Sequence, residues 1–247
     1  MGTSESIPTP EKPTRRRRVT WQAILIALIL VEFAAVVTLM VFQEPETVTI
    51  GVSAYVCGLT TLAVGVGILL ARQIWKPLQL HGCLSGLVFI LVGSLGAVYV
   101  ETVYWAFEKI FGAQGVAAHP NLIIDLLVTM PWYICMVTVL WFVQRRFRYH
   151  WTTVALLGVL CEAAGDGIVG HIVGGNAITL EYLFLLLVLF PGIFMVTYAP
   201  MVVIPVWLFP MDDKPYTGPR WLRVVGGFLP LLPLIPYGAI VILLFGA

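Results

Sequence analysis

Long apolar segments, separated by short polar ones, make up most of the chain. Seven of these segments are long enough to cross a bilayer, which takes about 20 helical residues. The expected spans are residues 21–42, 50–71, 82–107, 121–143, 152–174, 180–209 and 224–245. The pattern therefore predicts an all-α integral membrane protein, in which a bundle of seven transmembrane helices forms a single domain over residues 21–247.

Prolines modify the last two apolar runs. The sixth run contains Pro191, Pro200 and Pro205. Because proline removes a helix hydrogen bond, we expect one tilted and broken span there. In the seventh run, prolines recur every three residues from Pro230 to Pro236. That spacing predicts a helix that is kinked or partly 3₁₀.

The composition agrees with a membrane protein. The 247 residues are 60% hydrophobic and 11% charged, whereas a soluble domain is about 45–50% apolar and about 25% charged. An ordinary soluble domain is therefore excluded. Residues 1–20 differ from the rest because they are polar, contain three prolines and end in a basic run, so we expect a disordered tail.

Basic residues segregate to one side of the predicted bundle. If the N-terminus is cytoplasmic, every lysine and arginine except Lys109 falls in the tail or in an inner segment. The positive-inside rule therefore predicts a cytoplasmic N-terminus and an outside C-terminus. The run Arg15–Arg18 directly abuts the first span, so we expect it to contact anionic lipid head groups rather than nucleic acid. Compact loops favour a prokaryotic plasma membrane, the inner membrane.

Acidic residues, in contrast, lie inside the predicted spans. They are Glu32, Glu101, Asp125, Glu162, Asp166 and Glu181, and no lysine or arginine lies within these spans. A charged group at membrane depth costs about 2.5–3.5 kcal/mol or more, so such groups usually face the protein interior or a wet cavity and serve a function. Most of the six fall in the outer half of the bundle, which predicts an acidic cavity open to the outer face and lined by spans three to six.

The strongest candidate pair lies in the segment LCEAAGDGIVGHIVGGN, residues 160–176. Glu162 and Asp166 are four residues apart and share one face of an α-helix. A protonated carboxyl beside an ionised one is the arrangement that general acid–base catalysis uses. We take Glu162 and Asp166 as the candidate catalytic pair, with Glu101 and Asp125 as supporting or alternative acids. The candidate substrate-binding residues are Tyr104, Trp105, Asn121, His171, Asn176, Glu181 and Tyr182.

Structural roles remain open for several of these acids. Glu32 can form a hydrogen bond to a neighbouring helix, and Glu101 and Glu181 can lie at the water interface. Asp125 follows Asn121 closely, so it can occupy a first helical turn, where the helix dipole favours a carboxylate.

Cofactor and metal motifs are not evident. The chain has no GxxxxGK[ST] or GxSxG segment and no GxGxxG segment that follows a strand. A metal site built from Asp166, His171 and other acids is an alternative, but the chain has no HExxH or histidine-rich spacing to support it. We therefore expect neither a metal nor a cofactor.

In size and layout, with carboxylates as the only buried charges, the chain resembles small membrane-embedded cyclases and isomerases that act on isoprenoid lipids. The resemblance implies acid/base catalysis on a lipid or isoprenoid substrate, with membrane lipids as the other partners. Two alternatives use the same acids: a proton- or cation-coupled transporter, and an accessory subunit of a membrane complex. The sequence leaves the oligomeric state open.

Overall fold

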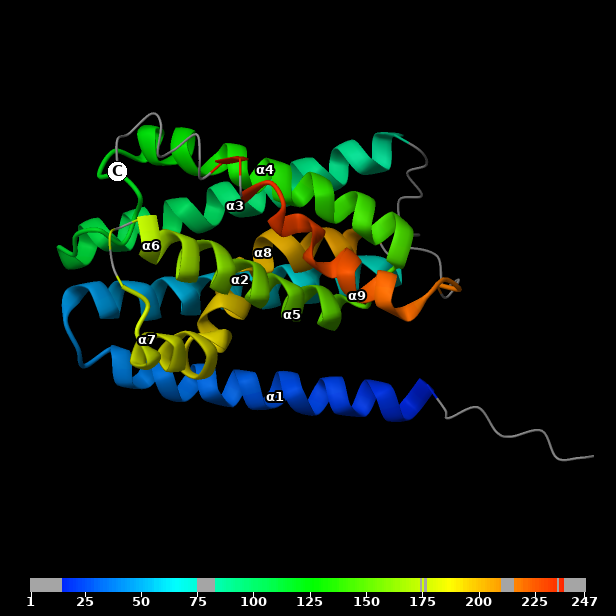
Figure 1. Cartoon of the computed structure of the whole chain (residues 1–247), viewed down its shortest axis with the longest axis horizontal. Helices are drawn as coiled ribbons and strands as arrows, with labels where there is room; N and C mark the ends of the chain where they lie inside the picture. The colour runs from blue at the N-terminus through cyan, green and yellow to red at the C-terminus, as the bar shows by residue number, and fades with distance from the viewer. Residues whose placement is uncertain are drawn as a thin grey trace, which may run out of the picture.

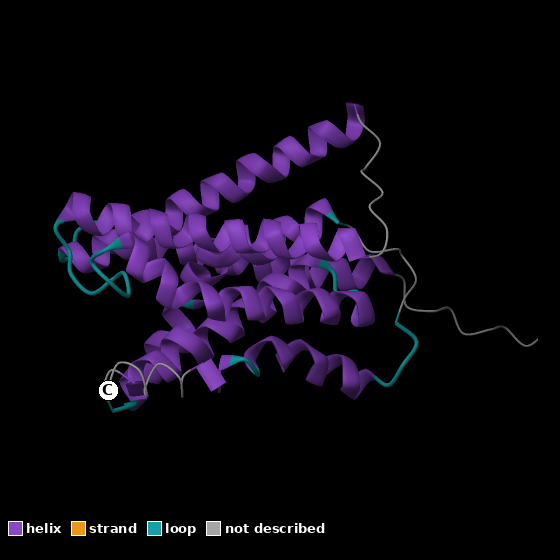
Figure 2. Ribbon diagram, turned by 90° about the horizontal axis from the view of Figure 1, so that it is seen from above, coloured by secondary structure: helices purple, strands orange, loops and turns teal. Residues whose placement is uncertain are grey.

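The structure is a computed structural model, and all the regular secondary structure that it describes is helical (Figure 2). It describes the backbone of residues 15–74, 83–173, 175, 177–209, 216–234 and 236–237. The side chain of Asp166 is not described. Residues 1–14 of the predicted tail, the predicted site residue Asn176 and the end of the seventh run lie outside the described residues.

The helices follow the apolar runs of the sequence (Figure 1). They are α1 (Arg15–Met40), α2 (Pro45–Ile74), α3 (Cys83–Phe111), α4 (Leu122–Phe147), α5 (Trp151–Glu162), η1 (Ala163–Gly170), α6 (His171–Val173), α7 (Leu180–Phe184), η2 (Leu185–Leu189), α8 (Pro191–Leu208), α9 (Arg220–Phe228) and η3 (Leu229–Leu231). The segments η1 and η2 are π-helices, and η3 is a 3₁₀-helix.

The helix lengths are those of a membrane protein. Among the described residues, four helices are long and apolar enough to cross a membrane: Pro45–Ala71, Leu84–Phe111, Leu122–Phe147 and Pro191–Leu208. Ile24–Met40 and Trp151–Gly165 are shorter apolar helices. The structure therefore has several apolar helices of membrane-spanning length, while the arrangement of seven spans stays a prediction.

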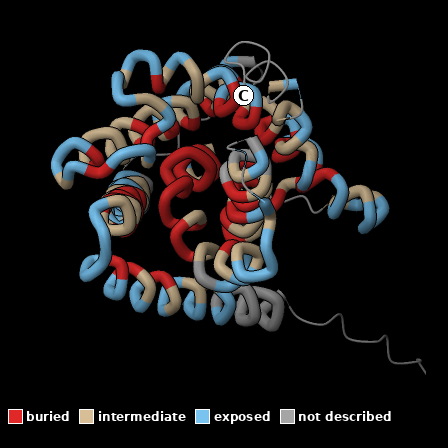
Figure 3. The backbone as a smooth tube through the Cα atoms, turned by 60° about the vertical axis from the view of Figure 1, so that its left-hand side comes forward, coloured by how far each residue is buried: buried red, intermediate tan, exposed pale blue. Residues whose placement is uncertain are grey.

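Helix α8 is the centre of the bundle. It packs against α1, α2, α3 and α5. An 18-residue apolar stretch of α8 is 72% buried inside the protein, whereas the corresponding stretch of α2 is 17% buried. Figure 3 shows the buried residues gathered in the interior and the exposed residues on the outer faces. Helices α2 and α3 therefore present one face to α8 and another face to the surroundings.

Contacts with α8 show in which direction the neighbouring helices run and which of their residues lie beside which part of α8. A Cβ atom on Gly96 of α3 would lie 2.6 Å from the carbonyl oxygen of Pro200, so only glycine allows this approach. Further along α3, Tyr104 contacts Thr197, so α3 runs antiparallel to α8. Trp151, at the start of α5, packs edge-on against Trp207 near the end of α8.

The sixth apolar run is broken, as its prolines predict, but at only one of them. The π-helix η2 ends at Leu189, and α8 begins at Pro191. Pro200 and Pro205 lie inside α8, which continues through both. The break therefore separates a short outer segment from the central helix.

The fifth run differs from the uniform α-helix that the sequence analysis assumed. Its α-helical part ends at Glu162 and continues as a π-helix through Asp166 to Gly170. The shared face inferred for Glu162 and Asp166 rested on the α-helical period, and that period does not apply beyond Glu162.

Candidate functional site

Polar side chains from four helices lie at one level of α8. We call this set the polar layer: Glu101 and Tyr104 of α3, Tyr133 of α4, Glu162 of α5, and Thr197 and Tyr198 of α8. The hydroxyl groups of Tyr104 and Thr197 form a hydrogen bond 2.8 Å long. The Tyr133 hydroxyl donates to the Tyr198 hydroxyl at 3.5 Å. These contacts place hydroxyl groups from α3, α4 and α8 in the interior of the bundle.

Glu162 enters the polar layer from α5. It continues the buried face of that helix after Ala155 and Val159, and it is only 1% exposed. Gly158, four residues earlier, lies against Val202 of α8. Since α5 and α8 run antiparallel, Glu162 reaches the level of Tyr198, four residues before Val202.

Glu101 enters the same layer from α3. It is 8% exposed and lies between Gly96, which contacts Pro200, and Tyr104, which contacts Thr197. It also lies near the thiol of Cys57 on α2. The side chain is therefore in the protein interior, not at the water interface that the sequence left as an alternative.

The polar layer can hold and transfer protons. It combines two carboxyl groups with tyrosine and threonine hydroxyls, and no lysine or arginine lies in the predicted spans to neutralise the acids. Burial in a low dielectric strengthens hydrogen bonds among such groups. Carboxyl groups held in this way supply general acid–base catalysis or a proton relay.

A second group of predicted residues gathers around the π-helices. The rings of His171 and Tyr182 stack with centroids 3.8 Å apart and planes at 13°, and Tyr182 donates a hydrogen bond to the carbonyl oxygen of Gly167 at 2.7 Å. Tyr182 therefore lies beside the π-helical segment that contains Asp166. Glu181, next to Tyr182, is exposed. π-Helical turns occur frequently at functional sites.

A third group anchors the loop between α3 and α4. The Trp105 indole donates to the Pro120 carbonyl at 2.9 Å, and the Asn121 side chain caps α4 by accepting from the N–H groups of Ile123 and Ile124. Asp125 accepts from the backbone N–H of His119 at 3.0 Å. Trp105, Asn121 and Asp125 thus have structural contacts outside the polar layer.

Asp125 has the position in a first helical turn that the sequence left as a structural alternative. It lies in the first turn of α4 and is fully buried. Its Oδ1 holds the loop, and its Oδ2 has no hydrogen-bond partner among the described residues. A carboxylate in this position is also favoured by the helix dipole.

Glu32 also forms the structural contact that the sequence left open. Its Oε2 accepts a hydrogen bond from the N–H of Gly192, in the first turn of α8, at 3.0 Å. The acid therefore joins α1 to the central helix at the break in the sixth run.

Sequence reasoning assigned no chemistry to Tyr133, Thr197 and Tyr198. These residues belong to two sequence motifs that indicate a buried polar site: MPWY at residues 130–133 and TYAP at residues 197–200. Both place a tyrosine two residues from a proline within a long apolar run. A hydroxyl at that depth needs a partner in the protein interior, and this requirement points to a polar site.

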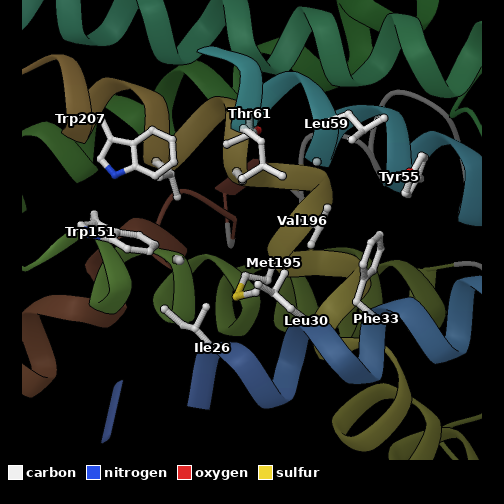
Figure 4. Close-up of a pocket in the computed structure, with 15 residues that line it drawn as sticks. Ile26, Leu30, Phe33, Tyr55, Leu59, Thr61, Trp151, Met195, Val196 and Trp207 are labelled. Carbon is white, nitrogen blue, oxygen red and sulfur yellow. The ribbon is translucent and has the colours of Figure 1, made fainter. Parts of the chain in front are cut away.

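An apolar groove lies on another side of α8. It has a cavity volume of about 260 Å³ and is lined by residues of α1, α2, α5 and α8 (Figure 4). Met195, Val196 and Ala199 contribute the α8 wall. These residues neighbour Thr197 and Tyr198 in the sequence, so the groove is at the same level of α8 as the polar layer.

The long apolar helices and the buried polar layer define a helical protein of membrane type. Within the described side chains, no three histidine, cysteine or acidic residues lie close enough together to hold a metal ion. No protein-family model, curated protein or solved structure matches the chain.

Proposed function

We propose that this protein is a membrane-embedded acid/base enzyme, of cyclase or isomerase type, acting on a lipid or isoprenoid substrate. One observation carries the proposal: Glu101 and Glu162, from two different helices, are buried at one level of α8 together with tyrosine and threonine hydroxyls. Burying acids in a bundle of apolar helices costs free energy, so acids in such positions usually serve a function.

Each residue has a role in this proposal. Glu162 and Asp166 transfer the proton, Glu101 is the supporting acid, and Tyr104 orients the substrate. His171 and Tyr182 bind the substrate near the π-helices. An isomerisation or cyclisation of an alkene adds a proton at one carbon and removes a proton from another, so the product keeps the composition of the substrate. Two acids and no redox cofactor are sufficient for such a reaction.

The proposal includes seven spans in a plasma membrane, prokaryotic in type, with the N-terminus inside. Helix α1 begins at Arg15, α2 carries Arg72 near its end, and α4 carries Arg145 and Arg146 in its last turn. A cysteine introduced at the exposed residue Gln114 is expected to react with a membrane-impermeant maleimide in intact cells. A cysteine at the exposed residue Thr217 is expected to react only after permeabilisation. The opposite pattern would reject this orientation.

The enzymatic proposal is tested by lipid analysis of whole membranes. Cells that produce the wild type are expected to accumulate a lipid product that is missing from cells producing Glu162→Gln or Glu101→Gln. Glu44→Gln, at an exposed residue between α1 and α2, is the matched control and should leave the product unchanged. An unaltered lipid profile in the presence of well-inserted wild type would reject the proposal.

Transport is the second candidate, and the broken sixth run favours it. Transporters often use discontinuous helices whose N-termini face a binding site within the membrane, and α8 begins inside an apolar run with the Glu32 carboxylate at its N-terminus. Proteoliposomes loaded with a pH-sensitive dye separate the two candidates. Proton flux that is lost in Glu32→Gln favours transport, whereas the absence of flux, with lipid turnover present, favours the enzyme.

A further inference from the structure

The apolar groove has the shape of a site for a hydrocarbon chain. Ile26, Leu30 and Phe33 of α1 form one wall, facing Met195 and Val196 of α8 across the cavity (Figure 4). Residues of α2 and α5 complete the lining. Nearly all of the lining surface is carbon, and Leu30 and Leu62 at its margin are 46% and 63% exposed. The groove is therefore open to the surroundings along its side.

Almost no polar atom is exposed on the lining of the groove. The hydroxyl of Thr61, which lines it, already donates to the carbonyl of Cys57 at 3.0 Å. A polar ligand would lose its hydration without gaining partners. A hydrocarbon chain forms no hydrogen bonds with water that it would lose on binding. The apolar lining therefore favours a hydrocarbon chain as the occupant.

The length of the groove corresponds to one leaflet. Along α8 it extends from Met195 to Trp207, which is about 18 Å at the helical rise per residue. Half of the hydrocarbon core of a bilayer is about 15 Å thick. One chain of one leaflet therefore fills the groove, and a membrane-spanning chain would exceed it.

One end of the groove is marked by Trp151 and Trp207. Helix α1 runs antiparallel to α8 and contacts it at Glu32 and Gly192. Counting about 22 Å along each helix from this contact reaches Arg17 on α1 and Trp207 on α8. The first turn of α1, which contains Arg15–Arg18, is therefore at the level of the tryptophan end. Tryptophans at this position are typical of the membrane–water interface.

We propose that the groove binds one acyl chain of an anionic glycerophospholipid, with its phosphate at the tryptophan end near Arg15–Arg18. Arginines next to a membrane attract anionic head groups. This lipid is distinct from any substrate of the polar layer, because the two sites have no lining residue in common. The inference thus goes beyond the proposed enzymatic function, and either one can fail without the other.

Native mass spectrometry of the purified full chain tests the proposal, with phosphatidylglycerol and phosphatidylcholine of identical chains as probes. The wild type is expected to retain one phosphatidylglycerol molecule and to prefer it over phosphatidylcholine. Leu30→Trp and Leu62→Trp fill the groove from its exposed margin and are expected to abolish this retention. Leu127→Trp, at a 70% exposed position on α4, is the matched control and should bind like the wild type.

Replacing Arg15–Arg18 by glutamine tests the head-group end without altering the groove. The preference for phosphatidylglycerol is expected to fall by about fivefold for each arginine that contributes, from the usual attraction of a basic residue to an anionic membrane surface. Equal retention of both lipids by the wild type would overturn the proposal. So would undiminished retention in folded groove variants, or, if those variants do not fold, an unchanged lipid preference in the arginine variant.

Discussion

The carboxylate of Glu32 accepts a hydrogen bond from the backbone N–H of Gly192, 160 residues further along the chain. The first N–H groups of a helix have no partner within that helix, and a carboxylate near them is favoured by the helix dipole. The contact therefore stabilises the beginning of the central helix α8. It also ties α1, which otherwise has a largely exposed surface, to the bundle.

Gly192→Ala is expected to destabilise the protein by about 1–3 kcal/mol, the usual cost of an overpacked site. The new Cβ would lie 2.5 Å from the Glu32 carboxylate oxygen and 2.9 Å from the carbonyl oxygen of Ile29. Gly67→Ala on α2 is the control, because no atom outside its own helix lies within 4 Å. Thermal unfolding in detergent compares the two, and equal stability of both variants would contradict this packing.

Tyr104 and Thr197 are expected to show energetic coupling. Their hydroxyls form the hydrogen bond that joins α3 to α8 in the polar layer. A double-mutant cycle with Tyr104→Phe and Thr197→Val should give a coupling free energy of about 0.6 kcal/mol, the average for hydrogen bonds between membrane helices, and at most about 1.7 kcal/mol. Additive effects of the two substitutions, within error, would mean that the hydroxyls do not interact.

Glu108→Ala is expected to loosen the loop between α3 and α4. The buried Glu108 carboxylate accepts from the N–H groups of Val116 at 2.9 Å and Ala117 at 2.7 Å. Without this carboxylate the two N–H groups have no acceptor, which costs about 1–3 kcal/mol. Their hydrogen exchange should therefore become about tenfold faster or more. Glu44→Ala serves as the control. Unchanged exchange at Val116 and Ala117 would show that the loop has other anchors.

Tyr149, between α4 and α5, makes stability fall at high pH. Burial raises the pKa of its phenol above the ordinary 10.0, an effect that the nearby Arg223 guanidinium opposes and Tyr216 reinforces. The phenol also donates to the Arg223 carbonyl, which requires its proton. The folded state thus binds this proton more tightly than the unfolded state. The stabilisation is complete below pH 10.0 and is lost as the pH rises through the folded-state pKa.

The variant Tyr149→Phe isolates this effect. Its unfolding free energy should decline less steeply above pH 10.0 than that of the wild type. Equilibrium unfolding at a series of alkaline pH values provides the comparison. Parallel pH profiles for the two proteins would show that Tyr149 makes no contribution in this range.

The helical class follows from the apolar runs, but the arrangement of the helices does not. A soluble helix shows its buried face through a periodic pattern, whereas α8 is apolar nearly all round. Its central position depends on side-chain packing, such as the approach of Gly96 to Pro200. The π-helix after Glu162 was likewise unpredictable, because its residues also suit an α-helix.

The sequence predicted which types of residue form the site, but it predicted less well which of these residues lie together. The depth of Glu101 and Glu162 in apolar runs indicated buried acids, and both are buried. Asp125 has the same kind of position, yet it anchors a loop through His119. The difference arises from tertiary contacts between segments. The same is true of His171 and Tyr182, whose rings stack although they belong to the separate helices α6 and α7.

The most direct test of the central proposal is turnover by purified protein. The wild type and the double variant Glu162→Gln/Asp166→Asn are incubated in nanodiscs prepared from the lipids of the host, and the lipids are separated by retention time and mass. Isomerisation and cyclisation keep the mass, so the separation has to resolve isomers. The proposal predicts that the wild type converts one lipid into an isomer and that the double variant does not. Conversion at the same rate by the double variant, or no conversion by either folded protein, would contradict it.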